Sequence, residues 1–274
     1  MNKQKSGSVS RRRRATPATA CLTLKTLPLA VALCFSPLAQ ADTINTTVNG
    51  LPQGGTVTAG SVSDQLTATK LTLTQTTPRA VIDWQSFNIG AGKEVQFIQP
   101  NANAAVLNRV AAGANMSEIY GTMSANGTVV LMNPNGVMFS QGASVNVGSL
   151  IVTTGSINQT AFMAEGPIAI TGATTGQITN EGRITAADAG LVAMVAPSVS
   201  NQGLIVANRG TVLLGGAAAA TISCGVRRMP SALSMRCSVS PFSSFNRART
   251  SFGRITPTEL PICVSLSAVM AKAP

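Results

Sequence analysis

The 274-residue chain has a formal net charge of +11, 45% hydrophobic residues and only 11% charged residues. This composition excludes an intrinsically disordered chain, which requires low hydrophobicity and high charge. The sequence contains no histidine, which excludes Ser-His and Cys-His catalysis and histidine-ligated metals.

The excess positive charge lies at the two ends of the chain. Residues 1–41 contain seven basic and no acidic residues, and residues 222–274 contain seven basic residues and one acid, Glu259. The central region, 42–221, has six basic and eight acidic residues and a net charge of −2. A basic binding face is therefore not a property of this region, and no nucleic-acid partner is expected.

Residues 1–41 have the order of an extended secretory signal peptide. Lys3, Lys5 and the run 11–14 are basic, residues 27–38 are mostly apolar, and Ala39-Gln40-Ala41 is a small-residue cleavage motif. The apolar stretch is too short for a comfortable membrane-spanning helix. We expect export to the periplasm and cleavage after Ala41.

Residues 42–221 have the composition of an all-β domain. Runs such as 71–74 and 128–132 are rich in Thr, Val and Leu, which favour strands. Glycine and Asn-Gly pairs recur throughout, and no long apolar pattern has a helical period.

A repeat of 21 residues predicts how these strands are arranged. Residues 178–186 align with 199–207 so that Asn180 matches Asn201 and Ile184 matches Ile205, and residues 121–132 form a looser copy. A unit of this length cannot bury its own apolar face and must stack on its neighbours. The sequence therefore predicts a parallel β-helix, with residues 42–76 as its amino-terminal cap.

Cysteines and carboxylates in the central region do not predict catalysis. All five cysteines lie outside residues 42–221, which excludes disulfides, Cys-ligated zinc and a cysteine nucleophile there. Its eight acidic residues are neither adjacent nor alternating. We therefore expect no catalytic residues, metal or cofactor, and we expect that the protein is not an enzyme. A polysaccharide-cleaving β-helix stays open as an alternative, because distant carboxylates can meet across coils. The scattered aromatic residues disfavour an outer-membrane barrel.

Four ordered motifs carry a family resemblance. They are Arg79-Ala-Val-Ile-Asp-Trp-Gln-Ser-Phe-Asn-Ile-Gly90, Val106-Leu-Asn-Arg-Val110, Leu131-Met-Asn-Pro-Asn-Gly-Val-Met-Phe139 and Ala143-Ser-Val-Asn-Val-Gly148. With these motifs, residues 42–221 resemble the amino-terminal two-partner secretion domain, or haemagglutination activity domain, of filamentous-haemagglutinin-like exoproteins.

The resemblance implies a right-handed parallel β-helix that acts as a secretion signal for a large adhesin. Its partner would be an outer-membrane β-barrel transporter with periplasmic POTRA domains, in a Gram-negative bacterium that secretes the exoprotein or displays it at the cell surface. A full-length form could have a host receptor or glycan, and direct adhesion by this β-helix is the main alternative function. By resemblance, the motif residues for transporter recognition are Asn133, Pro134, Asn135, Gly136, Asn101, Asn108 and Arg109.

The motif residues also have a purely structural interpretation. Asn133-Pro134-Asn135-Gly136 is a good β-turn sequence, because proline presets φ and Asn or Gly tolerates positive φ. The segment is thus expected to shape a corner of a coil, and its effect on secretion could act through folding. Trp84 and Phe87 are expected to be packing anchors.

The composition changes abruptly after residue 221. Residues 222–274 contain ten serines, three cysteines and only two glycines. We expect an atypical basic tail, produced by a shifted reading frame or running as a disordered segment, and thus a truncated exoprotein.

Overall fold

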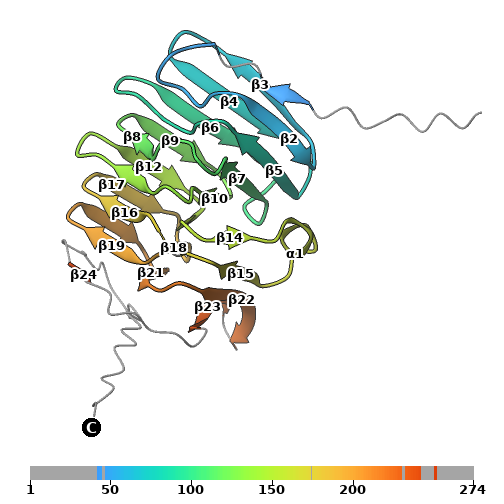
Figure 1. The fold of residues 1–274 in the computed structure, drawn as a ribbon. Helices are drawn as coiled ribbons and strands as arrows, with labels where there is room; N and C mark the ends of the chain where they lie inside the picture. The colour runs from blue at the N-terminus through green and yellow to red at the C-terminus, as the bar shows by residue number, and fades with distance from the viewer. Residues whose placement is uncertain (1–41, 45–46, 174, 230–231, 242–249, 252–274) are drawn as a thin grey trace, which may run out of the picture. The chain divides into compact units, whose positions relative to one another are not determined.

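The structure, a computed structural model, describes residues 42–44, 47–173, 175–229, 232–241 and 250–251. The predicted signal peptide and its cleavage site lie outside these residues. The described part of the chain forms a parallel β-solenoid of about six turns, with its first strands and its last strands at opposite ends of the stack (Figure 1). The predicted parallel β-helix is confirmed.

Three stacked sheets make up the solenoid. The long sheet has the order β1 (Thr43–Ile44), β2 (Gly55–Ala59), β5 (Arg79–Trp84), β7 (Ala105–Val110), β10 (Thr128–Met132), β13 (Ser149–Thr153), β18 (Leu191–Ala196) and β21 (Thr211–Gly216). The seven-stranded sheet has the order β20 (Leu204–Ala207), β17 (Arg183–Ala186), β12 (Ser144–Val147), β9 (Thr122–Ala125), β6 (Glu94–Ile98), β4 (Lys70–Gln75) and β3 (Val62–Leu66). The five-stranded sheet has the order β24 (Thr250–Ser251), β19 (Ser198–Asn201), β16 (Gln177–Asn180), β11 (Val137–Phe139) and β8 (Ser117–Ile119).

Each complete coil contributes one strand to each sheet. In one coil, β10 lies in the long sheet, β11 in the five-stranded sheet and β12 in the seven-stranded sheet, and β13 then pairs in parallel with β10. The predicted 21-residue repeat is confirmed by the register, which places Asn180 beside Asn201 and Ile184 beside Ile205.

The inside of the solenoid is the main hydrophobic core. Along the strands of the long sheet, alternate residues point inward, as the two-residue period of a β-strand requires. One inward row runs across successive coils and consists of Ala80, Val106, Val129, Leu150, Val192 and Val212. Aliphatic side chains thus stack on their equivalents one coil away.

The amino-terminal end is closed by antiparallel strands. β2 pairs antiparallel with β5, and β3 pairs antiparallel with β4, whereas the later neighbours in these two sheets are parallel. The cap predicted for residues 42–76 is therefore present at the start of the described chain.

The outer face of the long sheet is also apolar, which the sequence analysis did not predict. A second hydrophobic group, here called the outer cluster, lies on this face. It consists of Val81, Ala105, Leu107, Val130, Met132, Ile151, Ile157, Phe162, Ile170, Leu191, Ala193, Val195, Ala220 and Ile222. The long sheet is therefore buried on both faces, which explains continuous apolar runs such as 191–196.

An excursion from the solenoid covers this outer face. Between β13 and β18 the chain forms β14 (Ser156–Ile157), α1 (Gln159–Met163) and β15 (Ile168–Thr171), which lie beside the stack (Figure 1). The excursion lengthens the register step to 42 residues, because Leu150 pairs with Val192.

A capped helical turn fixes the excursion against the sheet. The side chain of Asn158 accepts a hydrogen bond from the amide nitrogen of Ala161 at 2.9 Å and so caps α1. The helix buries Phe162, and the guanidinium carbon of Arg79 lies 5.0 Å from the centre of that ring.

The predicted domain boundary at residue 221 falls within a strand. β22 (Ala220–Met229) pairs antiparallel with β15 and with β23 (Ala232–Pro241), which completes a four-stranded sheet of the order β14, β15, β22, β23. β24 pairs with β19 through two residues. Whether residues 222–274 arise from a shifted reading frame stays a prediction. No helix among the described residues is long and apolar enough to cross a membrane.

Candidate functional site

The Asn133-Pro134-Asn135-Gly136 segment forms the turn between β10 and β11. The amide nitrogen of Gly136 donates to the carbonyl oxygen of Asn133 at 3.1 Å, and the backbone nitrogen of Asn135 donates to Asn133 Oδ1 at 2.9 Å. The β-turn expected from the sequence is thus closed by both the backbone and the side chain of Asn133.

Asn133 is fully buried and ties this turn to the preceding coil. Its Nδ2 donates to the carbonyl oxygen of Asn115 at 3.0 Å and to Ser117 Oγ at 2.9 Å. Its backbone nitrogen donates to the carbonyl oxygen of Thr153 in the following coil at 3.0 Å. Asn133 therefore holds three coils together at one corner, and its side chain is not accessible to a partner.

The rest of the turn differs in exposure. Asn135 is exposed, Pro134 is half-buried and Gly136 is buried. Gly136 has a φ of +112°, and a Cβ atom on it would lie 2.7 Å from the carbonyl oxygen of Gln177 in the next coil. Only Asn135 is exposed, and its Nδ2 donates to Asn133 Oδ1 at 3.3 Å.

Gly136→Ala is expected to destabilise the chain by about 2 kcal/mol, because it combines positive-φ strain with a backbone overlap. A matched control is Gly92→Ala, since Gly92 also has a positive φ of 71° but has nothing within 4 Å of the added Cβ. Urea unfolding followed by circular dichroism measures both. Equal losses of unfolding free energy in the two variants would show that the contact with Gln177 in the next coil contributes nothing at Gly136.

Asn108 and Arg109 are neighbours in β7 but point to opposite faces of the long sheet. Asn108 is fully buried inside the solenoid, where its Oδ1 accepts from Trp84 Nε1 at 3.0 Å and its Nδ2 donates to the carbonyl oxygen of Val130 at 3.3 Å. These bonds satisfy a polar group within an apolar core. Trp84 and Phe87 are both buried and pack edge to face, with ring centres 5.7 Å apart.

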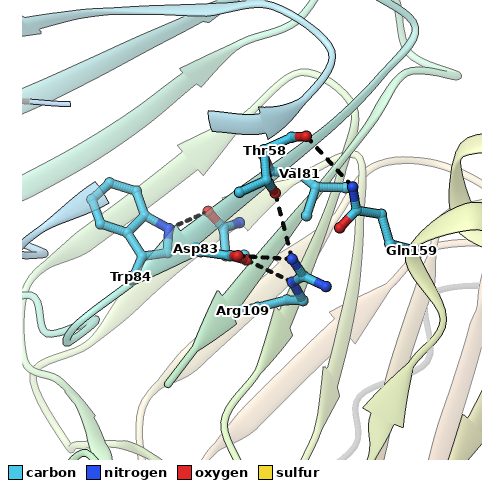
Figure 2. Close-up of polar contacts among 7 residues, drawn as sticks. Thr58, Val81, Asp83, Trp84, Arg109 and Gln159 are labelled. Carbon is cyan, nitrogen blue, oxygen red and sulfur yellow. Dashed lines mark hydrogen bonds and ion pairs between the residues drawn. The ribbon is translucent and has the colours of Figure 1, made fainter. Parts of the chain in front are cut away.

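Arg109 lies on the outer face and pairs with Asp83 of β5. Its Nε and Nη2 donate to the two carboxylate oxygens of Asp83 at 2.6 and 2.8 Å, and Nη2 also approaches Thr58 Oγ1 at 3.4 Å (Figure 2). The α1 residue Gln159 reaches the carbonyl oxygen of Thr58 at 3.5 Å. The pair joins adjacent strands and is half-exposed, so its contribution to stability is small.

Asn101 lies in an exposed turn before β7, where its Oδ1 accepts from the backbone nitrogen of Asn103 at 2.9 Å. The nearby Gln99 is buried, and its Nε2 donates to Gln75 Oε1 at 3.2 Å while its Oε1 accepts from the backbone nitrogen of Gly127 at 2.9 Å. A polar ladder thus runs along this corner of the stack.

The structure does not bring the seven motif residues together on one surface. Asn108, Asn133 and Gly136 are buried. Asn101 and Asn135 are exposed, but in different turns, and Arg109 lies half-buried on the outer face. The buried members can affect a partner only through the fold.

The most notable charged side chain missed by the sequence analysis is Arg79 at the outer cluster. Burial lowers the pKa of its guanidinium below the ordinary value, and the charge of Glu165 opposes this effect. Among the described residues, no group of three or more His, Cys, Asp or Glu side chains has the arrangement of a metal site. The clearest features are therefore polar ladders and turns between stacked coils.

This geometry defines the class of protein: a parallel β-helix with an antiparallel cap and an apolar outer excursion. The family model of the TPS secretion domain matches residues 49–251. The chain therefore belongs to the TPS secretion domain family. The match begins within the cap and extends through β24.

Similar proteins agree with this family. The chain is 40% identical over 177 residues to a heme/hemopexin-binding protein of Haemophilus influenzae (strain ATCC 51907 / DSM 11121 / KW20 / Rd), covering 60% of this chain and 19% of the relative. A second heme/hemopexin-binding protein of Haemophilus influenzae is 49% identical over 104 residues, covering 38% of this chain and 11% of the relative. The chain thus spans about a fifth or less of the length of these relatives.

A solved structure shows the same fold. The crystal structure of the HMW1 secretion domain from Haemophilus influenzae is 28% identical and superimposes with a TM-score of 0.62, covering 75% of this chain and 55% of that chain. The similarity covers most of the solenoid.

Proposed function

We propose that this chain provides the secretion signal of a large adhesin or haemagglutinin-like exoprotein, and that an outer-membrane β-barrel transporter recognises it in the periplasm through POTRA domains. The observation that carries the proposal is the TPS secretion domain match over residues 49–251, which coincides with the folded solenoid. The relatives support it, because in each the matched part is a minor fraction of a much longer protein.

The proposal assigns no chemistry to the solenoid. Its buried polar residues Asn108 and Asn133 are hydrogen-bonded within the fold through both their amide nitrogen and their amide oxygen, and such contacts favour a rigid scaffold over a reacting site. We therefore propose that the domain is not an enzyme. Haem or hemopexin binding is not proposed for it, since the chain has no histidine and matches only 19% of the relative that carries this name.

Export would proceed by the route that the amino-terminal sequence predicts. Residues 1–41 would direct the chain to the periplasm of a Gram-negative bacterium and be removed after Ala41. The transporter would then deliver the exoprotein to the cell surface or the medium. The solenoid region, 42–221, contains no cysteine, so no disulfide opposes passage of this region in an unfolded state.

The composition of the chain changes after residue 221, where the glycine-rich pattern stops. We propose that the reading frame shifts near residue 222. Translation of the gene in its other frames tests this, because the proposal expects further glycine-rich β-coils there. Their absence from every frame would contradict it.

The exposed motif residues are the candidates for direct contact with the transporter. Asn135 and Asn101 present their side chains to solvent, and Arg109 is partly accessible on the outer face. Asn133, Asn108 and Gly136 would support recognition by shaping the turns and strands.

Co-expression of the full chain with the outer-membrane transporter encoded nearest to its gene tests the proposal. We expect the chain in the medium only when the transporter is present. Asn135→Ala should reduce secretion with little change in the melting temperature, whereas Asn49→Ala, in an exposed turn of the cap, should leave secretion unchanged. Retention of the parent chain inside cells despite a functional transporter would refute the secretion role.

A further inference from the structure

The outer face of the seven-stranded sheet contains a shallow depression, here called the sheet hollow. It spans β6, β9 and β12, which lie side by side in the stack (Figure 1). Its volume is about 320 Å³, at the lower end of the roughly 300–1,000 Å³ range of ligand sites. The sheet hollow therefore has room for a small ligand.

The sheet hollow exists because a short side chain lies between two longer ones. Gln96, Ser124 and Asn146 pair in register and form one outward-facing row across three strands. The residue directly before each of them belongs to the main hydrophobic core, as the alternation of a β-strand requires. Because serine is shorter than glutamine or asparagine, the middle strand leaves a depression in this row.

Three polar side chains in the sheet hollow have unused hydrogen-bonding capacity. The side-chain amides of Gln96 and Asn146 make no hydrogen bond to the described part of the chain. Ser124 Oγ is buried and also has no hydrogen-bond partner among the described residues. A buried hydroxyl without a partner costs stability. Because neither amide is tied to the fold, both can turn toward a ligand and uncover this hydroxyl.

One end of the sheet hollow is rigid and partly apolar. Asn126 Oδ1 accepts from the backbone nitrogen of Gln99, and Asn126 Nδ2 donates to the carbonyl oxygen of Gln99, both at 2.7 Å. Ile98, which also lines the sheet hollow, is 44% exposed. Its side chain offers apolar surface against which a ligand can bury CH groups.

The lining of the sheet hollow restricts the chemistry of its ligand. Of the described residues that form this lining, none is charged. Glu94, two residues before Gln96 on β6, is already engaged by Lys70 in an ion pair at 3.0 Å. An anionic ligand would call for Arg or Lys in the lining. A peptide cannot be added as a strand, because β6, β9 and β12 are each paired on both sides. The features that remain suit a neutral ligand rich in hydroxyl groups.

We propose that the sheet hollow binds a neutral sugar ring of a glycan. A sugar hydroxyl both donates and accepts, and a side-chain amide offers both a donor and an acceptor. The amides of Gln96 and Asn146 bind hydroxyls on two sides of the ring, Ser124 Oγ bonds a hydroxyl between them, and Ile98 packs on the CH groups. The contact is small, so the dissociation constant is expected to be on the order of 1 mM. This site goes beyond the proposed secretion function and does not depend on it.

Titration of the isotopically labelled full chain with neutral disaccharides tests the proposal. The probes are lactose, maltose and cellobiose, and nitrogen–proton NMR spectra follow the side-chain NH₂ signals of Gln96 and Asn146. We expect at least one of these sugars to shift both signals in a saturable way. Glucuronic acid is the charged comparison and should leave them unchanged.

Two substitutions of the same kind locate the site. Ser124→Gln should fill the sheet hollow and weaken sugar binding by about tenfold or more. Thr185→Gln is the matched control, because Thr185 is also half-buried and pairs with Asn146 in the same row but does not line the sheet hollow. It should bind the sugar as the parent chain does.

Gln96→Ala is a second variant that does not depend on filling the sheet hollow. It removes one amide from a half-buried position and should weaken binding by about fivefold, as the loss of one hydrogen bond predicts. The shift of the Asn146 signal measures this loss, and the melting temperature shows that each variant is folded. If Ser124→Gln does not fold, Gln96→Ala decides the result.

The proposal is overturned if none of the three disaccharides gives saturable shifts. Equal binding by the parent chain and by folded Ser124→Gln would also overturn it, because the sugar would then bind elsewhere. Tighter binding of glucuronic acid than of the neutral sugars would show a site for anions and would contradict the assignment.

Discussion

Asn133→Ala is expected to lower the free energy of unfolding by about 3 kcal/mol, because it leaves several buried partners unsatisfied at once. The substitution removes both bonds from Nδ2, to Asn115 and Ser117, and the two bonds that Oδ1 accepts from the backbone nitrogen and the Nδ2 of Asn135. It also opens space at a fully buried position. Urea unfolding of the purified chain, followed by circular dichroism, measures the loss.

Asn135→Ala is the matched control for this result. Asn135 is exposed and adjacent in the same turn. Its side chain makes one long bond, from Nδ2 to Asn133 Oδ1 at 3.3 Å, and the variant keeps the shorter bond from its backbone nitrogen. We expect a change within about 0.5 kcal/mol, which is usual for a surface substitution. A stability loss at Asn135 as large as that at Asn133 would contradict the assignment of the structural role to the buried amide.

Trp84→Ala is expected to cost about 4 kcal/mol, within the range for truncating a buried tryptophan. Trp84 is 2% exposed, packs edge to face on Phe87, and donates its indole N–H to Asn108. Truncation creates a cavity beneath the cap and leaves Asn108 Oδ1 without this donor. Trp84 is the only tryptophan in the chain, so unfolding must be followed by circular dichroism.

Trp84→Phe separates the two contributions. Phenylalanine keeps most of the apolar burial but lacks the N–H donor, so a loss of about 1 to 2 kcal/mol is expected from the unsatisfied Asn108 oxygen. If Trp84→Phe were as destabilising as Trp84→Ala, the hydrogen bond to Asn108 would dominate and the packing contribution would be refuted.

The stacking of coils could be predicted from the sequence because the sequence itself repeats after 21 residues. Asn180 and Asn201 occur in matching nine-residue segments, and a parallel stack places equivalent residues beside each other. The turn at Asn133-Pro134 was predictable for a similar reason, since four consecutive residues determine it. The sequence could not show that Asn133 would be buried, because its partners Asn115 and Ser117 belong to the preceding coil.

The excursion after β13 could not be predicted in the same way. Its helix, Gln159–Met163, is five residues long and too short to show a helical period. One available signal was the run of apolar residues at 191–196, which indicates a strand buried on both faces and therefore a cover on the outer one. A second was Asn158, a favourable N-cap residue directly before the helix.

The excursion has a consequence for the order in which the chain can reach its native state. The outer-cluster residues Val81, Leu107 and Val130 precede the segment that covers them, which ends at Thr171. If the amino-terminal coils form first, their apolar outer surface stays exposed to solvent until residues 156–171 fold over it. A chain that emerges gradually from a ribosome or a pore therefore passes through a partly folded intermediate in which this apolar surface is uncovered. The risk of aggregation is greatest while this intermediate persists, before residues 156–171 cover the outer-cluster residues of the preceding coils.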